Sequence, residues 1–225
     1  MSPVIQDKKS VREDVPRRSR AGRPKDATKR AAILAAARDL FRAQSYDSVT
    51  MGAVAARAGV SKMTLYSHFA DKETMFETVV RAMSDEMISA IAGPDRAAAP
   101  LRERLNSVGI GFLRGVLDAS VRTMGLTLSA SLQTDQALAR RFYQAGPGRT
   151  RSALATIIAE AMACGELAAD SPEWAADDLI SLWEGGLPGQ LAFGLIEQAT
   201  EDEIVRRARR GTEVFLRAYS QPGKS

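Results

Sequence analysis

The chain is short of the residues that form disulfides and metal sites. Its 225 residues include one cysteine, Cys164, and one histidine, His68. One cysteine cannot form an internal disulfide, and a protein with a single thiol fits a reducing cytosol. One cysteine and one histidine also fall short of the ligand sets that hold zinc. We therefore expect no bound metal, no cofactor and a cytoplasmic location.

Long apolar stretches are missing as well. The longest uninterrupted apolar run covers residues 31–37, whereas a helix that crosses a bilayer needs roughly 18 such residues. The N-terminal residues contain no apolar stretch of the kind found in signal peptides, so we expect no secretory signal. The apolar fraction of 45% and the charged fraction of 26% are ordinary for a globular protein. These features predict one or two domains and no membrane partner.

Sequence motifs that carry catalysis are also absent. The chain has no GxSxG elbow, no phosphate-binding P-loop, no HExxH pair and no Rossmann fingerprint. The glycines within residues 185–189 follow no strand pattern, and His68 is the only histidine that could act as an acid or base. We therefore predict that the protein is not an enzyme.

Positive charge, by contrast, is concentrated at the N-terminus. Residues 1–30 hold ten Lys or Arg and four Asp or Glu, a net charge of +6, so that the rest of the chain, which totals +4, sums to −2. A basic segment on a slightly acidic body indicates a nucleic acid or an anionic membrane as partner, unless it is only a solubilising tail. Residues 1–25 lack the Trp, Phe and Leu face of a membrane-surface helix, which favours nucleic acid. Their prolines and lack of periodicity predict a flexible basic arm.

From Asp26 onward the pattern predicts an all-α protein. Alternating strand patterns and hairpin signals are absent, and apolar residues recur at helical spacing. Helices are predicted at about 27–43, 51–57, 62–69, 72–92, 101–118, 121–133, 135–145, 149–165, 172–196 and 201–219. Pro188 is expected to kink or split the segment at 172–196. We predict a helix-turn-helix domain at 26–72 and a second helical domain at 73–225.

Two short predicted helices around a glycine turn, within residues 50–72, are what a helix-turn-helix requires. Gly59 stands just past a helix end, where a positive φ is usual. Leu65 and Phe69 are four residues apart and share the inward face of the second helix, while Lys62 and Tyr66 share an outward face. A helix this short is held by its neighbours, so its outward face is free for a partner.

The outward residues suit the major groove of DNA. Lys62 can donate to guanine edges or phosphates, and Met63 can contact thymine methyl groups. Thr64, Tyr66 and His68 carry donors that can reach phosphate oxygens. The candidate DNA-contacting residues are Arg23, Lys25, Ser48, Thr50, Ser61, Lys62, Met63, Thr64, Tyr66, Ser67, His68 and Lys72. The alternative is that Tyr66 and His68 only complete a core.

Residues 23–80 resemble the N-terminal domain of TetR/AcrR-family transcriptional regulators. The resemblance lies in RPKDATKRAAILAAARDLF and SVTMGAVAARAGVSKMTLYSHFADKETMF. It implies a homodimer that binds double-stranded DNA at a pseudo-palindromic operator, with six residues at DNA-contacting positions: Lys62, Met63, Thr64, Tyr66, His68 and Lys72. Gly52 departs from the family, because some members carry a polar base-reading residue there. The text RAGRPK at 20–25 resembles a minor-groove arm, so deleting residues 1–25 should weaken binding and lower its salt dependence.

A looser resemblance links about residues 130–195 to an AefR-like C-terminal regulatory domain, in ALARRFYQAGPGRTRSALATIIAEAMACGELAADSPEWAADDL. For the whole chain the resemblance implies a regulator whose commonest role is repression with release by a small molecule. Activation, or DNA binding without a ligand, is equally compatible with the residues.

A heptad-like stripe in the last predicted helix suggests how two copies could pair. Apolar or small residues recur there at spacings of four and three, and a similar stripe lies in the preceding segment. The residues predicted at the dimer interface are Leu179, Ile180, Trp183, Leu187, Ile204, Ala208, Gly211, Phe215 and Ala218. Two such helices from each subunit would form a four-helix bundle. The alternative is that both helices pack within their own subunit.

A ligand pocket is expected in the middle of the second domain. Methionine and aromatic side chains suit an adaptable apolar cavity. The predicted lining residues are Met83, Met87, Phe112, Met124, Leu128, Phe142, Tyr143 and Trp183. The alternative is that these residues are ordinary core. Few charges fall within the apolar stripes, so a mainly apolar or aromatic small-molecule effector is expected.

Overall fold

The computed structural model describes residues 23–91 and 99–221, and within these ranges it contains helices and no β-strand. The all-α prediction is therefore confirmed. The elements are α1 (Arg23–Ala43), η1 (Tyr46–Ser48), α2 (Met51–Arg57), α3 (Lys62–His68), α4 (Lys72–Ile91), α5 (Leu101–Val116), α6 (Ala119–Thr134), α7 (Gln136–Ala145), α8 (Pro147–Ala163), α9 (Pro172–Glu184), α10 (Leu187–Ala192) and α11 (Glu201–Tyr219). No described helix combines the length and the apolar character needed to cross a bilayer.

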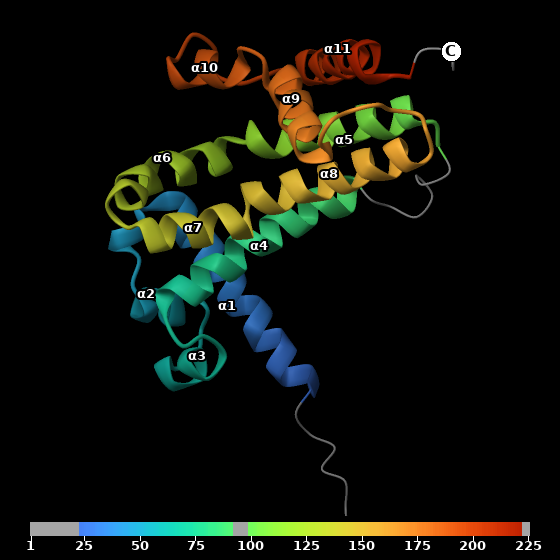
Figure 1. Cartoon of the computed structure of the whole chain (residues 1–225). Helices are drawn as coiled ribbons and strands as arrows, with labels where there is room; N and C mark the ends of the chain where they lie inside the picture. The colour runs from blue at the N-terminus through green and yellow to red at the C-terminus, as the bar shows by residue number, and fades with distance from the viewer. Residues whose placement is uncertain (1–22, 92–98, 222–225) are drawn as a thin grey trace, which may run out of the picture.

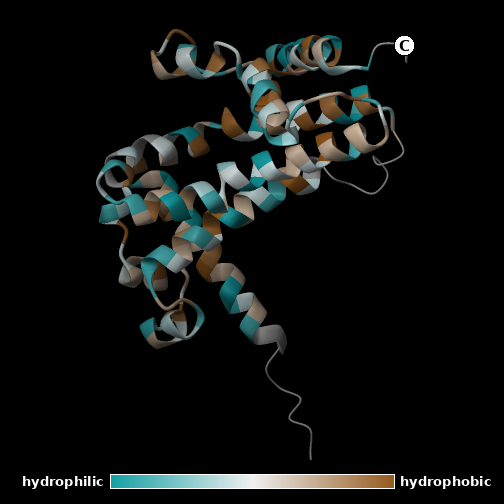
Figure 2. Ribbon diagram, viewed as in Figure 1, coloured by the Kyte–Doolittle hydropathy of each residue, from teal (hydrophilic) through white to brown (hydrophobic). Residues whose placement is uncertain are grey.

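The helices enclose two apolar cores. The first core joins α1, α2 and α3 to α4, α6 and α7, and the second joins α5, α8, α9 and α11. Figure 1 shows α3 at one end of the molecule and α10 and α11 at the opposite end, with α4 and α8 between them. The hydrophobic residues of α1 gather where that helix meets α4 (Figure 2). Helix α4 therefore connects the part that carries α3 with the rest of the chain.

Several element boundaries differ from those predicted, and two of the differences change the description of the chain. Helix α1 begins at Arg23, so residues 23–25 of the predicted arm are helical, and residues 1–22 lie outside the described part. Pro24 is tolerated because the N–H groups of a first helical turn have no partner within the helix. The segment predicted at 172–196 is split into α9 and α10, but at Gly185, whose φ of 50° breaks the helix, and not at Pro188, which lies in the first turn of α10.

The predicted boundary at residue 72 does not separate the two cores. Met75, Phe76, Val79 and Val80 of α4 are buried in the same core as Leu65 of α3. The beginning of α4 is thus packed as part of the helix-turn-helix, and the division into domains at 26–72 and 73–225 stays a prediction.

The stripe predicted as a dimer seam is core within a single subunit, as the alternative held. Helix α11 packs on α5 and α9 of its own chain. Seven of the nine predicted interface residues are buried there: Leu179, Trp183, Leu187, Ile204, Ala208, Gly211 and Phe215. Ile180 is half-buried, and only Ala218 is exposed. The prediction is wrong for the buried residues because helical periodicity marks the apolar face of a helix without saying which surface covers it.

The indole of Trp183 explains the small residues in this core. A Cβ atom at Gly109 of α5 would lie 2.6 Å from Trp183 Cε2, and one at Gly211 of α11 would lie 2.7 Å from Trp183 Cδ1. The two glycines therefore form a slot for the ring. The indole Nε1 donates a 3.1 Å hydrogen bond to the hydroxyl of Thr212, which is fully buried. Gly211 brings α11 close to α9 of its own chain and is not placed to bring two subunits together.

Candidate functional site

Local capping fixes the geometry of α2 and α3. Thr50 precedes α2, and its hydroxyl accepts a 3.1 Å hydrogen bond from the backbone N–H of Ala53. Ser61 caps α3 in the same way by accepting from Thr64 at 3.1 Å. Between the helices, Gly59 has a φ of 65°, which a residue with a side chain rarely adopts. The two capping residues and the glycine therefore determine the geometry of the turn, and all three can be recognised in the sequence.

The inward face of α3 is anchored in the first core, as predicted. Leu65 is completely buried and Phe69, just after α3, is 2% exposed. Val54 of α2 is buried in the same core, and the guanidinium of Arg30 in α1 lies 5.3 Å from the centre of the Phe69 ring. Because this face is held by α1, α2 and α4, the opposite face of α3 has a fixed orientation.

The outward face of α3 is open to solvent. Met63 is 83% exposed and Tyr66 is 53% exposed, while Lys62 and Ser67 are exposed as well. The aliphatic stem of Lys62 passes over Gly52 of α2, where a Cβ atom would lie 3.2 Å from Lys62 Cε. The absence of a side chain at Gly52 thus makes room for this lysine. The alternative that Tyr66 completes a core does not hold, since more than half of the residue is exposed.

His68 is placed differently from the prediction. Its side chain is only 9% exposed, and its Nε2 lies 3.2 Å from the carboxylate of Asp26 in α1. The imidazole therefore ties α3 to α1, so its predicted position on the outward DNA-contacting face is wrong. No local pattern in the sequence indicates this contact, because the two residues are far apart along the chain.

The side chain of Lys72 is also engaged within the protein. Its ammonium donates a 3.1 Å hydrogen bond to the backbone carbonyl of Tyr46 and lies 4.2 Å from the centre of the Tyr46 ring. Burial, with the Glu73 carboxylate nearby, raises the pKa of the Tyr46 phenol, which stays protonated and donates to Glu73 at 3.2 Å. Lys72 thus links η1 to the start of α4, and its contact with DNA stays a prediction.

Most of the remaining predicted residues carry hydroxyl groups and lie in or next to η1, α2 and α3. Ser48 is exposed and shares a 2.7 Å hydrogen bond with Ser45. Thr64 is half-buried and its hydroxyl lies 3.0 Å from that of Ser61, while Ser67 donates to the backbone carbonyl of Thr64. Thr50 and Ser61 accept backbone hydrogen bonds as caps. Arg23 and Lys25 belong to α1, but their side chains lie outside the described part.

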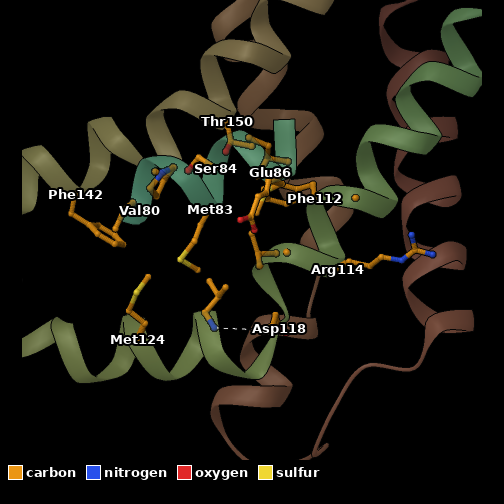
Figure 3. Close-up of a pocket in the computed structure, with 18 of the residues that line it drawn as sticks. Val80, Met83, Ser84, Glu86, Phe112, Arg114, Asp118, Met124, Phe142 and Thr150 are labelled. Carbon is orange, nitrogen blue, oxygen red and sulfur yellow. Dashed lines mark hydrogen bonds between the residues drawn. The ribbon is translucent and has the colours of Figure 1, made fainter. Parts of the chain in front are cut away.

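A cavity of about 520 Å³ lies where the two cores meet. Five of the eight predicted lining residues are found there: Met83, Met87, Phe112, Met124 and Phe142. Figure 3 shows side chains of α4, α5, α6 and α7 around this space, with Met83 and Met124 extending toward one another. Its volume falls within the range typical of small-molecule sites.

Three of the predicted lining residues lie elsewhere. Leu128 is 1% exposed in the first core, and Trp183 is fully buried in the second. Tyr143 is 52% exposed on the surface of α7. These predictions are wrong because residue type alone does not distinguish the wall of a cavity from a filled core or a surface.

The charged residues of the cavity were not predicted from the sequence. Arg38 and Arg42 of α1, Glu86 of α4 and Glu184 of α9 all line it, which corrects the expectation of a wall with few charges. Nη1 of Arg38 lies 2.8 Å from the Glu86 carboxylate. The spacing of four between the two arginines placed them on one face of α1, but only the fold brings α9 to the same cavity.

Comparison with known families gives two matches. The profile described as "Bacterial regulatory proteins, tetR family" matches residues 33–79, which include α2 and α3. The profile described as "AefR-like transcriptional repressor, C-terminal domain" matches residues 103–221, more than half of the chain.

Individual relatives agree with these matches. The HTH-type transcriptional activator FasR of Mycolicibacterium smegmatis is 33% identical over 89 residues, 40% of this chain and 40% of FasR. The HTH-type transcriptional regulator YdeS of Bacillus subtilis is 44% identical over 54 residues, 24% of this chain and 27% of YdeS. The chain thus spans less than half the length of these two relatives. As transcriptional regulators, the relatives agree with the prediction that the chain is not an enzyme.

Solved structures match over nearly the whole chain. The Flavonoid-responsive Regulator FrrA is 30% identical, with a TM-score of 0.72, and the alignment covers 88% of this chain and 100% of FrrA. A protein from Mesorhizobium loti described as a TetR-family transcriptional regulator is 24% identical, with a TM-score of 0.74, over 88% of this chain and 99% of that one. At 24% identity, the match to the Mesorhizobium loti protein shows similarity of fold alone.

Proposed function

Because the chain belongs to the tetR family of bacterial transcriptional regulators, we propose that it is a repressor that binds a pseudo-palindromic operator as a homodimer and is released by a small molecule. The observation that carries the DNA-binding mode is the outward face of α3. Lys62, Met63 and Tyr66 are exposed on a short helix whose opposite face is buried. Such a helix can enter the major groove with its side chains against base edges. Its DNA target implies that the protein works in the cytoplasm.

The contacts divide into two kinds. Lys62 and Met63 stand at the N-terminal end of α3, which is the end that reads bases in helix-turn-helix proteins. The hydroxyls of Thr50, Ser61 and Tyr66 are proposed to bind phosphates and so to fix the register of the protein on the duplex. Met63 supplies apolar contact with thymine methyl groups.

Selection of bound duplexes from a randomised pool tests this mode of binding. We expect enrichment of two inverted half-sites whose centres are about one helical turn, roughly 34 Å, or a multiple of it apart. Retention of unrelated sequences with no half-site would contradict the proposal. Placing the selected duplex upstream of a reporter then gives the sign of regulation: reduced transcription supports repression, while increased transcription would support activation, the role that the name of FasR states.

The basic arm is proposed to add phosphate or minor-groove contacts. Residues 1–22, which precede α1, hold six Lys or Arg. Each phosphate contact adds close to one unit to the slope of log affinity against log salt concentration. We expect that removing residues 1–22 weakens duplex binding and lowers this slope by several units, measured by fluorescence anisotropy at several salt concentrations. An unchanged slope would show that the arm does not contact DNA.

A homodimer is proposed on the surface around α10, in place of the buried stripe. Phe193 and Leu195 are 83% and 73% exposed just after α10, at the end of the molecule opposite α3 (Figure 1). Contact between two copies at this end would leave both α3 helices free. We expect the chain to elute from size-exclusion at twice its 24.3 kDa mass, and a Phe193→Asp, Leu195→Asp double variant to elute as a monomer.

A matched variant controls for the added charge in this experiment. The double variant Gln133→Asp, Gln136→Asp places two acidic residues at exposed positions where α6 meets α7 and should leave the elution unchanged. A wild-type monomer at micromolar concentration, or a double variant that stays dimeric, would contradict the proposed interface.

Effector release is proposed to act through α4. This helix starts directly after α3, and Val80, Met83 and Met87 on it line the cavity. A ligand that favours one arrangement of α4 changes the position of α3, and hence the spacing of the two recognition helices in a dimer. Coupling of this kind is of order 1–3 kcal/mol, or about 5- to 150-fold in operator affinity.

A further inference from the structure

Two charged side chains in the cavity wall have no partner for their charge among the described residues. Arg42 of α1 makes no hydrogen bond or ion pair with any of them, and its Nε is buried. The carboxylate of Glu184 in α9 also lacks such a partner within residues 23–91 and 99–221. Burial raises the pKa of the Glu184 carboxyl, in keeping with its poor solvation. A poorly solvated polar group without a hydrogen-bond partner lowers the stability of the protein. A ligand that supplies the missing partner recovers that free energy on binding.

The α1 side of the cavity offers more than one donor. Arg38 lies one helical turn before Arg42 and also lines the cavity. Its Nη1 donates to Glu86 at 2.8 Å, but its Nε is buried without a partner. Two adjacent guanidinium groups with unused N–H donors match the geometry of an acidic group with two oxygens.

The rest of the wall is mostly apolar, although Ser84, Glu86, Arg114, Asp118 and Thr150 also line the cavity. Helix α1 belongs to the first core and α9 to the second, and the cavity lies between the two cores. Met83, Phe112 and Phe142 line it, and Figure 3 shows these side chains around the central space. A ligand that reaches both α1 and α9 therefore needs an apolar middle part.

We propose that the effector of this cavity is an aromatic compound with an acidic group at one end, bound by Arg38 and Arg42, and a hydroxyl at the other, which donates to Glu184. The inference rests on the proposed function, in which this cavity receives the effector. It also indicates how the effector acts on the DNA-binding part. An acidic group that binds Arg38 competes with Glu86, and so weakens an ion pair between α1 and α4.

Three related compounds test the proposal on the full-length chain by isothermal titration calorimetry. They are hydroxybiphenyl carboxylic acid, with its hydroxyl and carboxyl at opposite ends, biphenyl carboxylic acid and hydroxybiphenyl. We expect the first compound to bind about tenfold more tightly than either of the others. One charge-assisted hydrogen bond contributes a gain in affinity of this size. Arg42→Gln should remove the advantage of the carboxyl group, and Glu184→Leu should remove the advantage of the hydroxyl.

Control variants carry the same changes at exposed positions. Arg140→Gln and Glu166→Leu lie outside the cavity and should keep the full ranking of the compounds. Should Glu184→Leu fold poorly, Glu184→Gln is the replacement, because its amide retains an acceptor without the charge and should keep only part of the hydroxyl advantage.

Several outcomes would overturn the proposal. These are equal binding of the three compounds, advantages that persist in both cavity variants, and no binding of hydroxybiphenyl carboxylic acid at millimolar concentration. Sequence-selective duplex binding, measured on the same samples, is independent of these results. Its absence would refute the proposed function, whereas its presence beside a failed ligand test would refute only this inference.

Discussion

Replacing Lys62 by glutamate should lower the affinity of the protein for its selected duplex by about 100-fold or more. One lost base or phosphate contact in a half-site costs about 1–3 kcal/mol, and a dimer loses it twice. The new carboxylate also faces the phosphates. Lys62 is exposed and makes no hydrogen bond or ion pair with a described residue, so the thermal unfolding of the variant should match that of the wild type. Fluorescence anisotropy with the selected duplex measures the loss.

A charge reversal elsewhere is the control for this experiment. Arg140→Glu changes the net charge equally on an exposed part of α7 and should weaken binding only slightly. Milder substitutions separate the two kinds of contact: Lys62→Ala should relax the preference at particular bases, while Tyr66→Phe should weaken binding to all sequences. Unchanged affinity of Lys62→Glu would mean that α3 does not face the DNA.

Replacing Trp183 by alanine should lower the free energy of unfolding by about 3–5 kcal/mol. The indole is completely buried in the slot between Gly109 and Gly211. Its removal leaves a cavity that the surrounding helices cannot easily close, because glycines form two of its sides. The fully buried hydroxyl of Thr212 also loses the Nε1 donor, which adds to the cost. Urea unfolding followed by circular dichroism measures the change.

The same helix offers a matched control. Trp174 lies at the opposite end of α9 from Trp183 and is 69% exposed. Trp174→Ala should therefore change the free energy of unfolding by no more than about 0.5 kcal/mol. Equal effects of the two substitutions would contradict the packing described for Trp183.

The helix-turn-helix could be predicted from the sequence because its signals are local. The positive φ of Gly59, the cap at Ser61 and the spacing of Leu65 and Phe69 all act within a few residues. Each of them restricts the backbone or the orientation of one short helix. The exposed positions of Lys62, Met63 and Tyr66 follow from these constraints.

The features that could not be predicted depend on contacts between distant residues. His68 of α3 contacts Asp26 of α1, and nothing in the spacing of either residue indicates this contact. The spacing of apolar residues on α11 predicts a buried stripe, but it does not indicate that the neighbours that bury it are α5 and α9 of the same chain. The cavity likewise exists only once α1 and α9 are brought to its two sides.

The central claim is that the outward face of α3 reads DNA, and a crystal structure of the protein with its selected duplex tests it most directly. The account predicts α3 in the major groove, with Lys62 and Met63 against base edges and the hydroxyl of Tyr66 at a phosphate. A duplex seated instead on the exposed arginines of α11, such as Arg209 and Arg210, with α3 turned away from it, would contradict the account.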